Sequence, residues 1–190
     1  MGFGLCPKLH ATRLWTFPVL YAIDDGFSLQ TRNDLAHAMA AWGEKTRILF
    51  KPVAAALTAN TVRVTKSESV NKWSSGDQGM QGTHPSPSIA IKLHNCLQIK
   101  DGTSRDTLVH ELGHLLGLAH EHDRPDAKAF RSTLSIAGEM TELVAKNATD
   151  VKKYVTYGAF DTDSIMCYGT KNVVGPSAGD LAALKAMYGL

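Results

Sequence analysis

The sequence has few cysteines, no long apolar run and almost no net charge. It holds three cysteines, Cys6, Cys96 and Cys167, and this odd count excludes a framework built from disulfides. No segment approaches the roughly 18 consecutive apolar residues that a membrane-spanning helix needs, so we expect no membrane partner. The 20 basic and 18 acidic residues give a net charge of +2, which predicts no binding to nucleic acid.

The chain also lacks internal repeats, low-complexity tracts and a recognisable secretory signal. The opening segment MGFGLCPKLHATRLW contains no apolar run of the kind that directs secretion, so the sequence leaves the compartment open. With 190 residues and 44% hydrophobic side chains, the chain is long enough to bury a core. We expect one domain, or two lobes around one cleft.

Apolar periodicity and turn residues predict a mixture of strands and helices. Strands are expected at Leu14–Ile23, Arg47–Val53, Thr61–Val64 and Ser88–Leu93. The last of these alternates as a half-exposed edge strand does. Helices are expected at Thr31–Thr46, Arg105–Leu118, Leu134–Val155 and from Ser177 onward. The polar stretch Lys66–Pro87 is expected to be a loop.

The segment HELGHLLGLAH, residues 110–120, contains three histidines and a glutamate within eleven positions. On a helix of 3.6 residues per turn, His110 and His114 project about 40° apart and can reach the same metal ion. Glu111 lies about 60° from His114, beside the ligand row but displaced from it. This is the position of a general base rather than of a third ligand.

The third histidine requires the helix to end. If the helix continued, His120 would lie about 9 Å along the axis and about 240° around from His114. Gly117 can adopt the left-handed conformation that ends a helix, so we expect the chain to turn there and to bring His120 to the metal. Three neutral histidines with an open fourth position are typical of a catalytic zinc site, which predicts one Zn²⁺ ion as cofactor.

This donor set predicts peptide hydrolysis. Zinc lowers the pKa of a bound water to about 7, and Glu111 would take the proton and pass it to the leaving amine. The competing interpretation is a chance alignment of surface histidines, which Gly117 and His120 at their fixed offsets make the weaker one. The other histidines have no such partners, and we expect each to be solvated or hydrogen-bonded: His10, His37, His84, His94 and His122.

Two motifs carry a resemblance to a known family. Residues 110–126, HELGHLLGLAHEHDRPD, resemble the zinc-binding motif HExxHxxGxxHExxRxD of the astacin family of metzincin zinc endopeptidases, with every fixed position present. Residues 164–168, SIMCY, resemble the Met-turn SxMHY of the same family. The resemblance implies that Met166 forms a hydrophobic base under the metal and that Tyr168 is a further zinc ligand with a catalytic role. It also implies that Glu121 lies where the family buries its mature N-terminus.

The resemblance implies an α+β, two-lobed zincin fold of the metzincin type. A twisted mixed sheet and two long helices would form the upper lobe, and an irregular lower lobe would carry the C-terminal helix. The single catalytic domain would span residues 1–190, with a leader or extension at 1–13 and lobes at 14–120 and 121–190. An extended polypeptide substrate would pair with the edge strand Ser88–Leu93, and we expect a monomer.

The chain also departs from the family pattern. Of the cysteines of the family's two disulfides only Cys96 has a counterpart, so we expect neither bridge, which is compatible with a reducing compartment. Cys167 replaces the histidine of the Met-turn. The thiolate of Cys6 in the leader could occupy the open zinc position, although an inert cysteine is the simpler interpretation.

Three functions stay open at this point. The leading one is a zinc-dependent endopeptidase with Glu111 as general base, and the second is an inactive zinc-binding protein that holds peptides or partners in the same groove. The retained Glu111 favours the enzyme, because an inactive relative has little use for a base beside the metal. Hydrolysis of another amide, such as a bacterial wall cross-link, is compatible with the same metal site.

Overall fold

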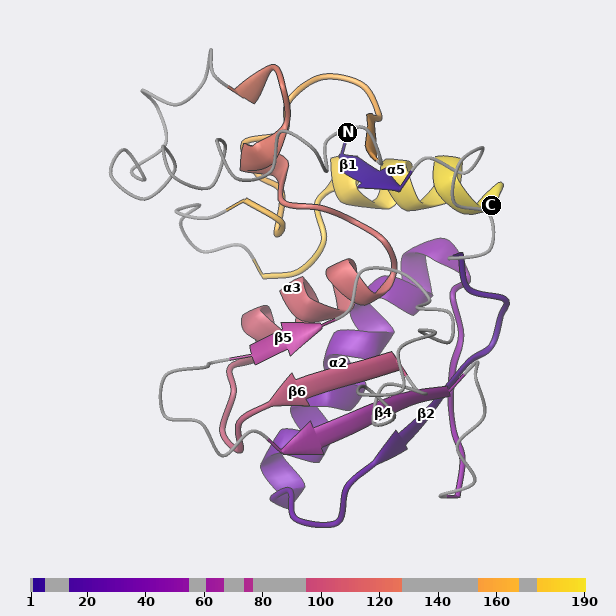
Figure 1. The fold of residues 1–190 in the computed structure, drawn as a ribbon, viewed down its shortest axis with the longest axis vertical. Coiled ribbons are helices and arrows are strands. Elements are labelled where there is room, and N and C mark those ends of the chain that lie inside the picture. The colour runs from indigo at the N-terminus through magenta and orange to yellow at the C-terminus, as the bar shows by residue number, and fades with distance from the viewer. Residues whose placement is uncertain are drawn as a thin grey trace, which may run out of the picture.

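The computed structural model describes residues 2–5, 14–54, 61–66, 74–76, 95–127, 154–167 and 174–190. Its larger part is a five-stranded sheet of order β3-β2-β4-β6-β5 (Figure 1). The sheet is parallel except at one edge, where the last strand runs antiparallel to its neighbour. The strands are β2 (Val19–Ile23), β3 (Phe50–Pro52), β4 (Thr61–Lys66), β5 (Ser74–Gly76) and β6 (Asn95–Ile99).

Buried aliphatic residues on β4 and β6 make this sheet part of the core. Val62 and Val64 on β4 and Leu97 and Ile99 on β6 are at most 1% exposed, whereas Arg63 between the two valines is exposed. This is the alternation of a strand with one buried face. Because strand β4 pairs in register with both β2 and β6, it places the valines at the centre of the sheet.

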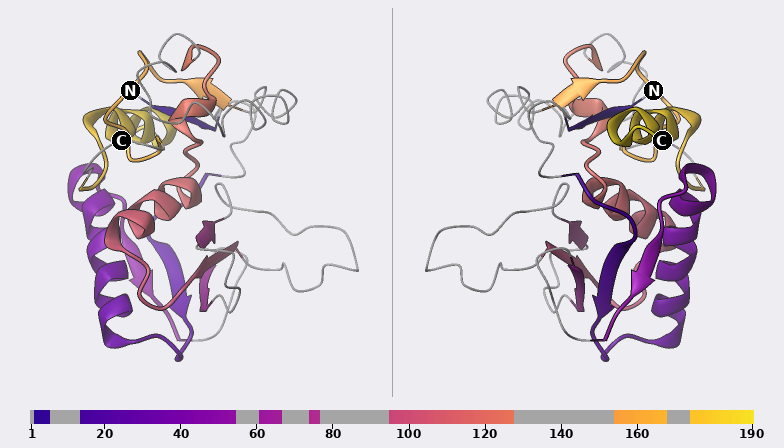
Figure 2. Two further views of the ribbon diagram at one scale, coloured as in Figure 1. Left: turned by 90° about the vertical axis from the view of Figure 1, so that its left-hand side faces the viewer. Right: turned by 90° about the vertical axis from the view of Figure 1, so that its right-hand side faces the viewer.

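Two helices pack together beside this sheet: α2 (Leu29–Thr46) and α3 (Arg105–Leu115) (Figures 1 and 2). Helix α2 buries Leu35, Met39 and Trp42, which recur at helical spacing along one face. The indole Nε1 of Trp42 donates to the carbonyl of Val109 on α3 at 3.0 Å. This bond joins the two helices at the level of His110.

The smaller part combines both ends of the chain. Strand β1 (Phe3–Leu5) pairs antiparallel with β7 (Tyr154–Thr156) and contacts helix α5 (Ala178–Tyr188), as Figure 2 shows near the two termini. Helix α5 begins at a capping box in which Ser177 and Asp180 bond each other's backbone N–H groups. Residues 2–5, expected as part of a leader, therefore belong to the fold.

Several predicted strands, loops and helices differ from the observed ones in their bounds or in their type. The predicted strand from Leu14 starts only at Val19, since Pro18 has no N–H to donate. The predicted loop Lys66–Pro87 contains β5, whose Ser and Gly residues show no apolar period and which is held by pairing with β6. Tyr154 and Val155 belong to β7, not to the end of a helix. Strand β6 was not predicted.

Other predictions fall outside the described residues. These are Cys6, the edge strand Ser88–Leu93, Tyr168, most of the helix Leu134–Val155, and the histidines His10, His84 and His94. Within the part of the chain that the structure describes, no helix has the length and apolarity needed to cross a membrane.

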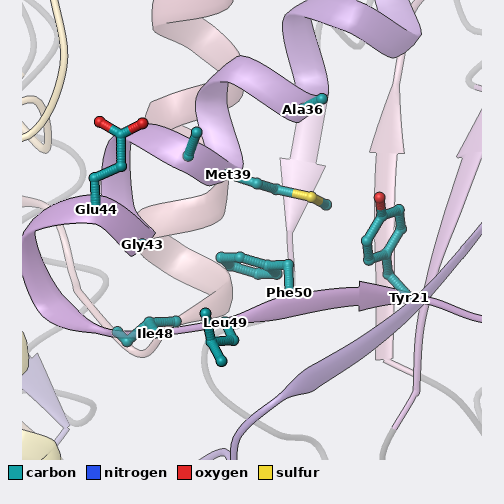
Figure 3. Close-up of a pocket in the computed structure, with 9 residues that line it drawn as sticks. Tyr21, Ala36, Met39, Gly43, Glu44, Ile48, Leu49 and Phe50 are labelled. Carbon is teal, nitrogen blue, oxygen red and sulfur yellow. The ribbon is translucent and has the colours of Figure 1, made fainter.

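An apolar pocket opens between α2 and the edge strand β3 (Figure 3). Met39 and Phe50 point into it, and Tyr21 lies at one side. The carboxylate of Glu44 points away from Met39 and Phe50. The pocket shares no residue with the histidine cluster described below.

Candidate metal centre

Helix α3 presents the first two histidines and Glu111. It begins at Ser104, whose hydroxyl accepts the N–H of Thr107, and it buries His110, Glu111 and His114. The helix is held against α2 along this stretch, so the two imidazoles start from a fixed backbone. Four residues of separation on a regular helix place them on the same face, as the spacing predicts.

The helix ends at the predicted glycine. Gly117 has φ of 100°, and its N–H bonds the carbonyl of His114 at 2.8 Å while the N–H of Leu118 bonds that of Gly113 at 2.9 Å. These two bonds define a Schellman motif, which needs a left-handed residue and so favours glycine. The predicted helix to Leu118 is thus too long, because the motif terminates it at Leu115.

Two distant aromatic residues satisfy the last carbonyls of α3. The indole Nε1 of Trp15 donates to the carbonyl of Leu115 at 2.7 Å, and the hydroxyl of Tyr188 donates to that of Leu116 at 2.8 Å. Burial raises the pKa of Tyr188 well above its usual value, so its hydroxyl keeps the proton and stays a donor. The turn that redirects the chain toward His120 is therefore fixed from both parts of the molecule.

The three imidazoles converge through their Nε2 atoms. The Nε2 of His120 lies 3.0 Å from that of His114 and 3.3 Å from that of His110. On the other side of each ring, Nδ1 of His110 faces the carbonyl of Ile165 at 2.7 Å, and Nδ1 of His114 faces that of Leu118 at 2.9 Å. A carbonyl only accepts, so both Nδ1 atoms carry the hydrogen and both Nε2 atoms present a lone pair.

These lone pairs fit a zinc ion. Two nitrogens each about 2.0–2.1 Å from one zinc at a tetrahedral angle lie about 3.3 Å apart, close to the two observed separations. Burial and the neighbouring imidazoles lower the pKa of both His114 and His120 well below the usual value, so both are neutral, as ligands must be. Neutral rings with converging lone pairs repel one another unless a cation lies between them.

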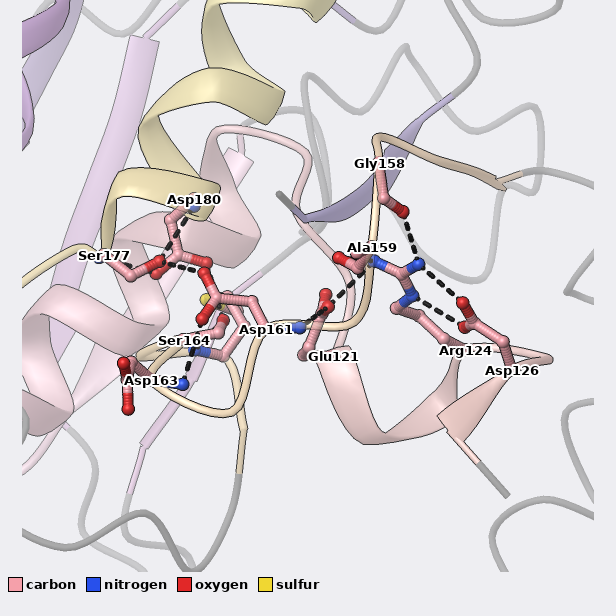
Figure 4. A network of polar contacts seen from close by, with 11 residues as sticks. Glu121, Arg124, Asp126, Gly158, Ala159, Asp161, Asp163, Ser164, Ser177 and Asp180 are labelled. Atoms are coloured by element: carbon pink, nitrogen blue, oxygen red, sulfur yellow. Dashed lines mark hydrogen bonds and ion pairs between the residues drawn. The ribbon is translucent and has the colours of Figure 1, made fainter. Parts of the chain in front are cut away.

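The turn that carries Met166 supports this cluster. The sulfur of Met166 packs under α3 at Gly113, where an added Cβ would lie 2.5 Å from it. The buried carboxylate of Asp180 accepts from the hydroxyl of Ser164 at 2.6 Å and from the N–H of Ile165 at 3.0 Å. Asp180 thereby holds the backbone whose carbonyl orients His110. Figure 4 shows Asp180 beside Ser164 and Ser177.

Cys167 follows in the same turn and is buried. Its burial raises the pKa of the thiol to about 12, so the thiol is protonated at neutral pH.

A buried ion pair fixes the segment after His120. Figure 4 shows the guanidinium of Arg124 with Glu121 and the carbonyls of Gly158 and Ala159 on one side and Asp126 on the other. The guanidinium lies 2.9 Å from Oε1 of Glu121 and makes two bonds of 2.8 Å to Asp126. Burial raises the pKa of Glu121 to about 7 against the lowering effect of the Asp161 N–H and Arg124. Its Oε2 has no hydrogen-bond partner among the described residues.

A fourth histidine lies beside the histidine cluster. His122, expected to be solvated or hydrogen-bonded, is buried rather than solvated: it is 1% exposed and stacks on His120 with ring centroids 4.7 Å apart. A prediction from spacing on a continuing helix misses this, because Glu121–Asp123 form a 3₁₀ turn after an extended residue.

Sequence reasoning also missed the residues that orient the rings. The carbonyls of Ile165 and Leu118 have no side-chain signal to read, because any residue supplies a carbonyl. The carboxylate of Asp123 lies 3.4 Å from Nδ1 of His120. In the sequence, the only sign of this contact is an acidic residue three positions after a histidine.

Comparison with known proteins assigns the chain to a class of peptidases. Residues 8–187 match the peptidase family described as Astacin, and the chain belongs to this family. It is 28% identical over 180 residues to zinc metalloproteinase nas-2 of Caenorhabditis elegans, covering 90% of this chain and 58% of that protein. A shorter stretch of 65 residues is 38% identical to astacin-like metalloprotease toxin 2 of Loxosceles intermedia, covering 33% of this chain and 24% of the toxin.

Solved structures show the same fold. A hatching enzyme zinc-protease of the medaka Oryzias latipes, high choriolytic enzyme 1, superposes with a TM-score of 0.66 at 18% identity, covering 95% of this chain and 96% of its own. Myroilysin superposes with a TM-score of 0.63 at 20% identity, covering 98% of both chains. The predicted α+β zincin fold of the metzincin type is confirmed.

The family also confirms the predicted cofactor. Astacin zinc metalloproteinases use one zinc ion, and His110, His114 and His120 form the three-histidine cluster that fits it. The chain spans only 58%, 26% and 32% of the lengths of three zinc metalloproteinases that it matches, so those proteins carry further sequence.

Proposed function

We propose that the chain is a zinc-dependent endopeptidase in which His110, His114 and His120 hold the metal. The observation that carries this proposal is the convergence of three Nε2 atoms, with a carbonyl or carboxylate oxygen facing the Nδ1 of each ring. When bound in such a site, zinc acts as a Lewis acid toward a carbonyl and lowers the pKa of water to about 7. Family membership supports the same reaction class.

Glu111 is the proposed general base. Its carboxylate is buried on α3, next to His110 in sequence and in the same helical turn as His114. A carboxylate there takes the proton of the attacking water and returns it to the nitrogen of the leaving amine, so one residue serves as base and then as acid. Burial excludes bulk water, which strengthens the interaction of this charge with the reacting groups.

Further roles follow from the family resemblance. We propose Met166 as the apolar base beneath the metal, Tyr168 as a further ligand and catalytic group, and Glu121 as a supporting residue. The substrate is proposed to be an extended polypeptide that pairs with a sheet edge at Ser88–Leu93. We also propose that the chain acts as a monomer.

The replacement Glu111→Gln tests the mechanism. We expect it to lower cleavage of a denatured protein substrate by at least about 10²-fold, because an amide cannot accept the proton. Zinc content, measured by elemental analysis, should stay at one ion per chain, since the three ligands are unchanged. The matched control is Glu44→Gln, which neutralises an exposed carboxylate on α2 and should cleave as the wild type does.

Equal rates for the wild type and Glu111→Gln would refute the assigned base. A wild type that binds zinc and peptides but cleaves no denatured protein would instead support the inactive binding protein.

A further inference from the structure

The third zinc-site histidine is backed by a different kind of group from the other two. His110 and His114 each face a backbone carbonyl, whereas Nδ1 of His120 faces the carboxylate of Asp123 at 3.4 Å. A carboxylate is a charged acceptor, and its attraction for an N–H exceeds that of a neutral carbonyl. The side chain of Asp123 is 14% exposed, so solvent screens this attraction only in part.

Local backbone geometry places Asp123 beside the ring. His120 is extended, and the 3₁₀ turn Glu121–Asp123 follows it directly. The N–H of Asp123 donates to the carbonyl of His120 at 3.1 Å, which closes the turn and brings residues i and i+3 to the same side. Arg124, fixed by a buried bond to Glu121 and a further bond to the exposed Asp126, holds the end of this turn.

The second carboxylate oxygen of Asp123 faces another imidazole. Oδ1 lies 4.0 Å from Nε2 of the buried His122, whose ring stacks on His120 at an interplanar angle of 18°. Asp123 therefore lies beside two stacked rings, with one carboxylate oxygen toward a nitrogen of each. This arrangement restricts rotation of both His120 and the carboxylate that faces it.

We propose that Asp123 is a positioning residue that orients His120 and raises the affinity of the site for zinc. The proposal rests on the three-histidine site proposed above. A zinc ion with three neutral histidines carries a charge of 2+ in a buried site, and a nearby carboxylate on the ligand side offsets part of it. Outer carboxylates of this kind typically contribute about 10- to 100-fold in metal affinity.

Zinc affinity of the full chain, measured by competition with a chromophoric chelator, tests the proposal. We expect Asp123→Ala to weaken zinc binding by about 10- to 100-fold, and Asp123→Asn by less, because the amide oxygen can still accept from Nδ1. The absorption spectrum of the cobalt(II)-substituted protein should shift in both variants, since the orientation of one ligand changes. Circular dichroism of the metal-free variants should match the wild type.

The matched control is Asp163→Asn, which removes an exposed carboxylate from the same part of the molecule. It should bind zinc as the wild type does. Wild-type affinity and an unchanged cobalt spectrum in both Asp123 variants would overturn the proposal, as would an equal loss of affinity in Asp163→Asn. A wild type that binds no zinc would overturn the three-histidine site itself, and the proposal with it.

Discussion

Gly113 is the residue of α3 that packs against the sulfur of Met166. A Cβ at this position would lie 2.5 Å from the sulfur of Met166 and 3.2 Å from the ring of Trp42, both inside ordinary contact distance. The glycine lies between His110 and His114, so any shift of the helix there also moves the proposed metal site. The Met-turn and the helix thus need a residue without a side chain at their contact.

We predict that Gly113→Ala destabilises the fold by about 1–3 kcal/mol, because overpacking forces side chains and backbone apart. Urea unfolding followed by tryptophan fluorescence measures the change. Gly26→Ala is the control, since its Cβ would meet only Lys66 at 3.8 Å and should leave stability nearly unchanged. Equal stability of the two variants would show that Met166 moves aside without cost.

At this scale, spacing alone predicted that the three histidines come together. The helical period placed His110, Glu111 and His114, and the failure of that period at His120 required the turn at Gly117, which the structure shows. What spacing could not predict is the partner of each ring. Two of the partners are backbone carbonyls. The third is the carboxylate of Asp123, which a 3₁₀ turn brings to the ring, and no periodic pattern in the sequence predicts that turn.

Among the elements, α2 and the turn before α3 are joined through one carboxylate. Asp101 accepts from the N–H and hydroxyl of Ser28, the N-cap of α2, and from the hydroxyl of Thr31 at 2.6 Å. These bonds lower the pKa of Asp101 from 3.8 to about 2. The carboxylate of Asp101 therefore binds the N-terminus of α2, although in sequence it lies just before α3.

The pH dependence of this link follows from the direction of the shift. A pKa lowered in the folded state means that the unfolded chain binds the proton first, so the stabilisation is complete above about pH 4 and is lost as the pH falls toward 2. We predict that Asp101→Asn is less stable than the wild type at pH 6 and that the difference vanishes near pH 2. Urea midpoints at several pH values measure it.

The control for this series is Asp25→Asn, an exposed carboxylate near the start of α2. Its stability should follow that of the wild type over the whole pH range. A difference between Asp101→Asn and the wild type that stayed constant down to pH 2 would contradict the ionic origin of the link.

Elements with local stop and start signals were predictable, and those defined by pairing were not. Helices α2, α3 and α5 have serine N-caps and apolar spacing, and their positions agree with the prediction to within a few residues. Strands β1, β5 and β7 have three residues each and are held by partners distant in sequence. Such short strands carry too few residues for a period to appear.

For the whole molecule, the proposed metal site is where the two parts meet. Helix α3 belongs to the sheet part and supplies His110 and His114. The carbonyl of Ile165, held by Asp180 of α5, belongs to the part that contains both chain ends. His120 lies on the segment that leads from one part to the other. A metal ion held by all three histidines would therefore add a cross-link to the hydrogen bonds that already join these parts, such as the one from Tyr188 to the carbonyl of Leu116.

Removal of the metal should then lower the stability of the entire fold. Ligand binding at a free concentration of about 100 times Kd stabilises by about 2.7 kcal/mol, which corresponds to about 5–10 °C in Tm for a chain of this size. We predict a fall of this order when calorimetry is repeated after exhaustive chelation, with recovery on adding zinc. In His114→Ala, which lacks one ligand, Tm should be nearly the same with and without zinc. An unchanged Tm in wild-type protein shown by elemental analysis to have lost its zinc would mean that the two parts hold together without the ion.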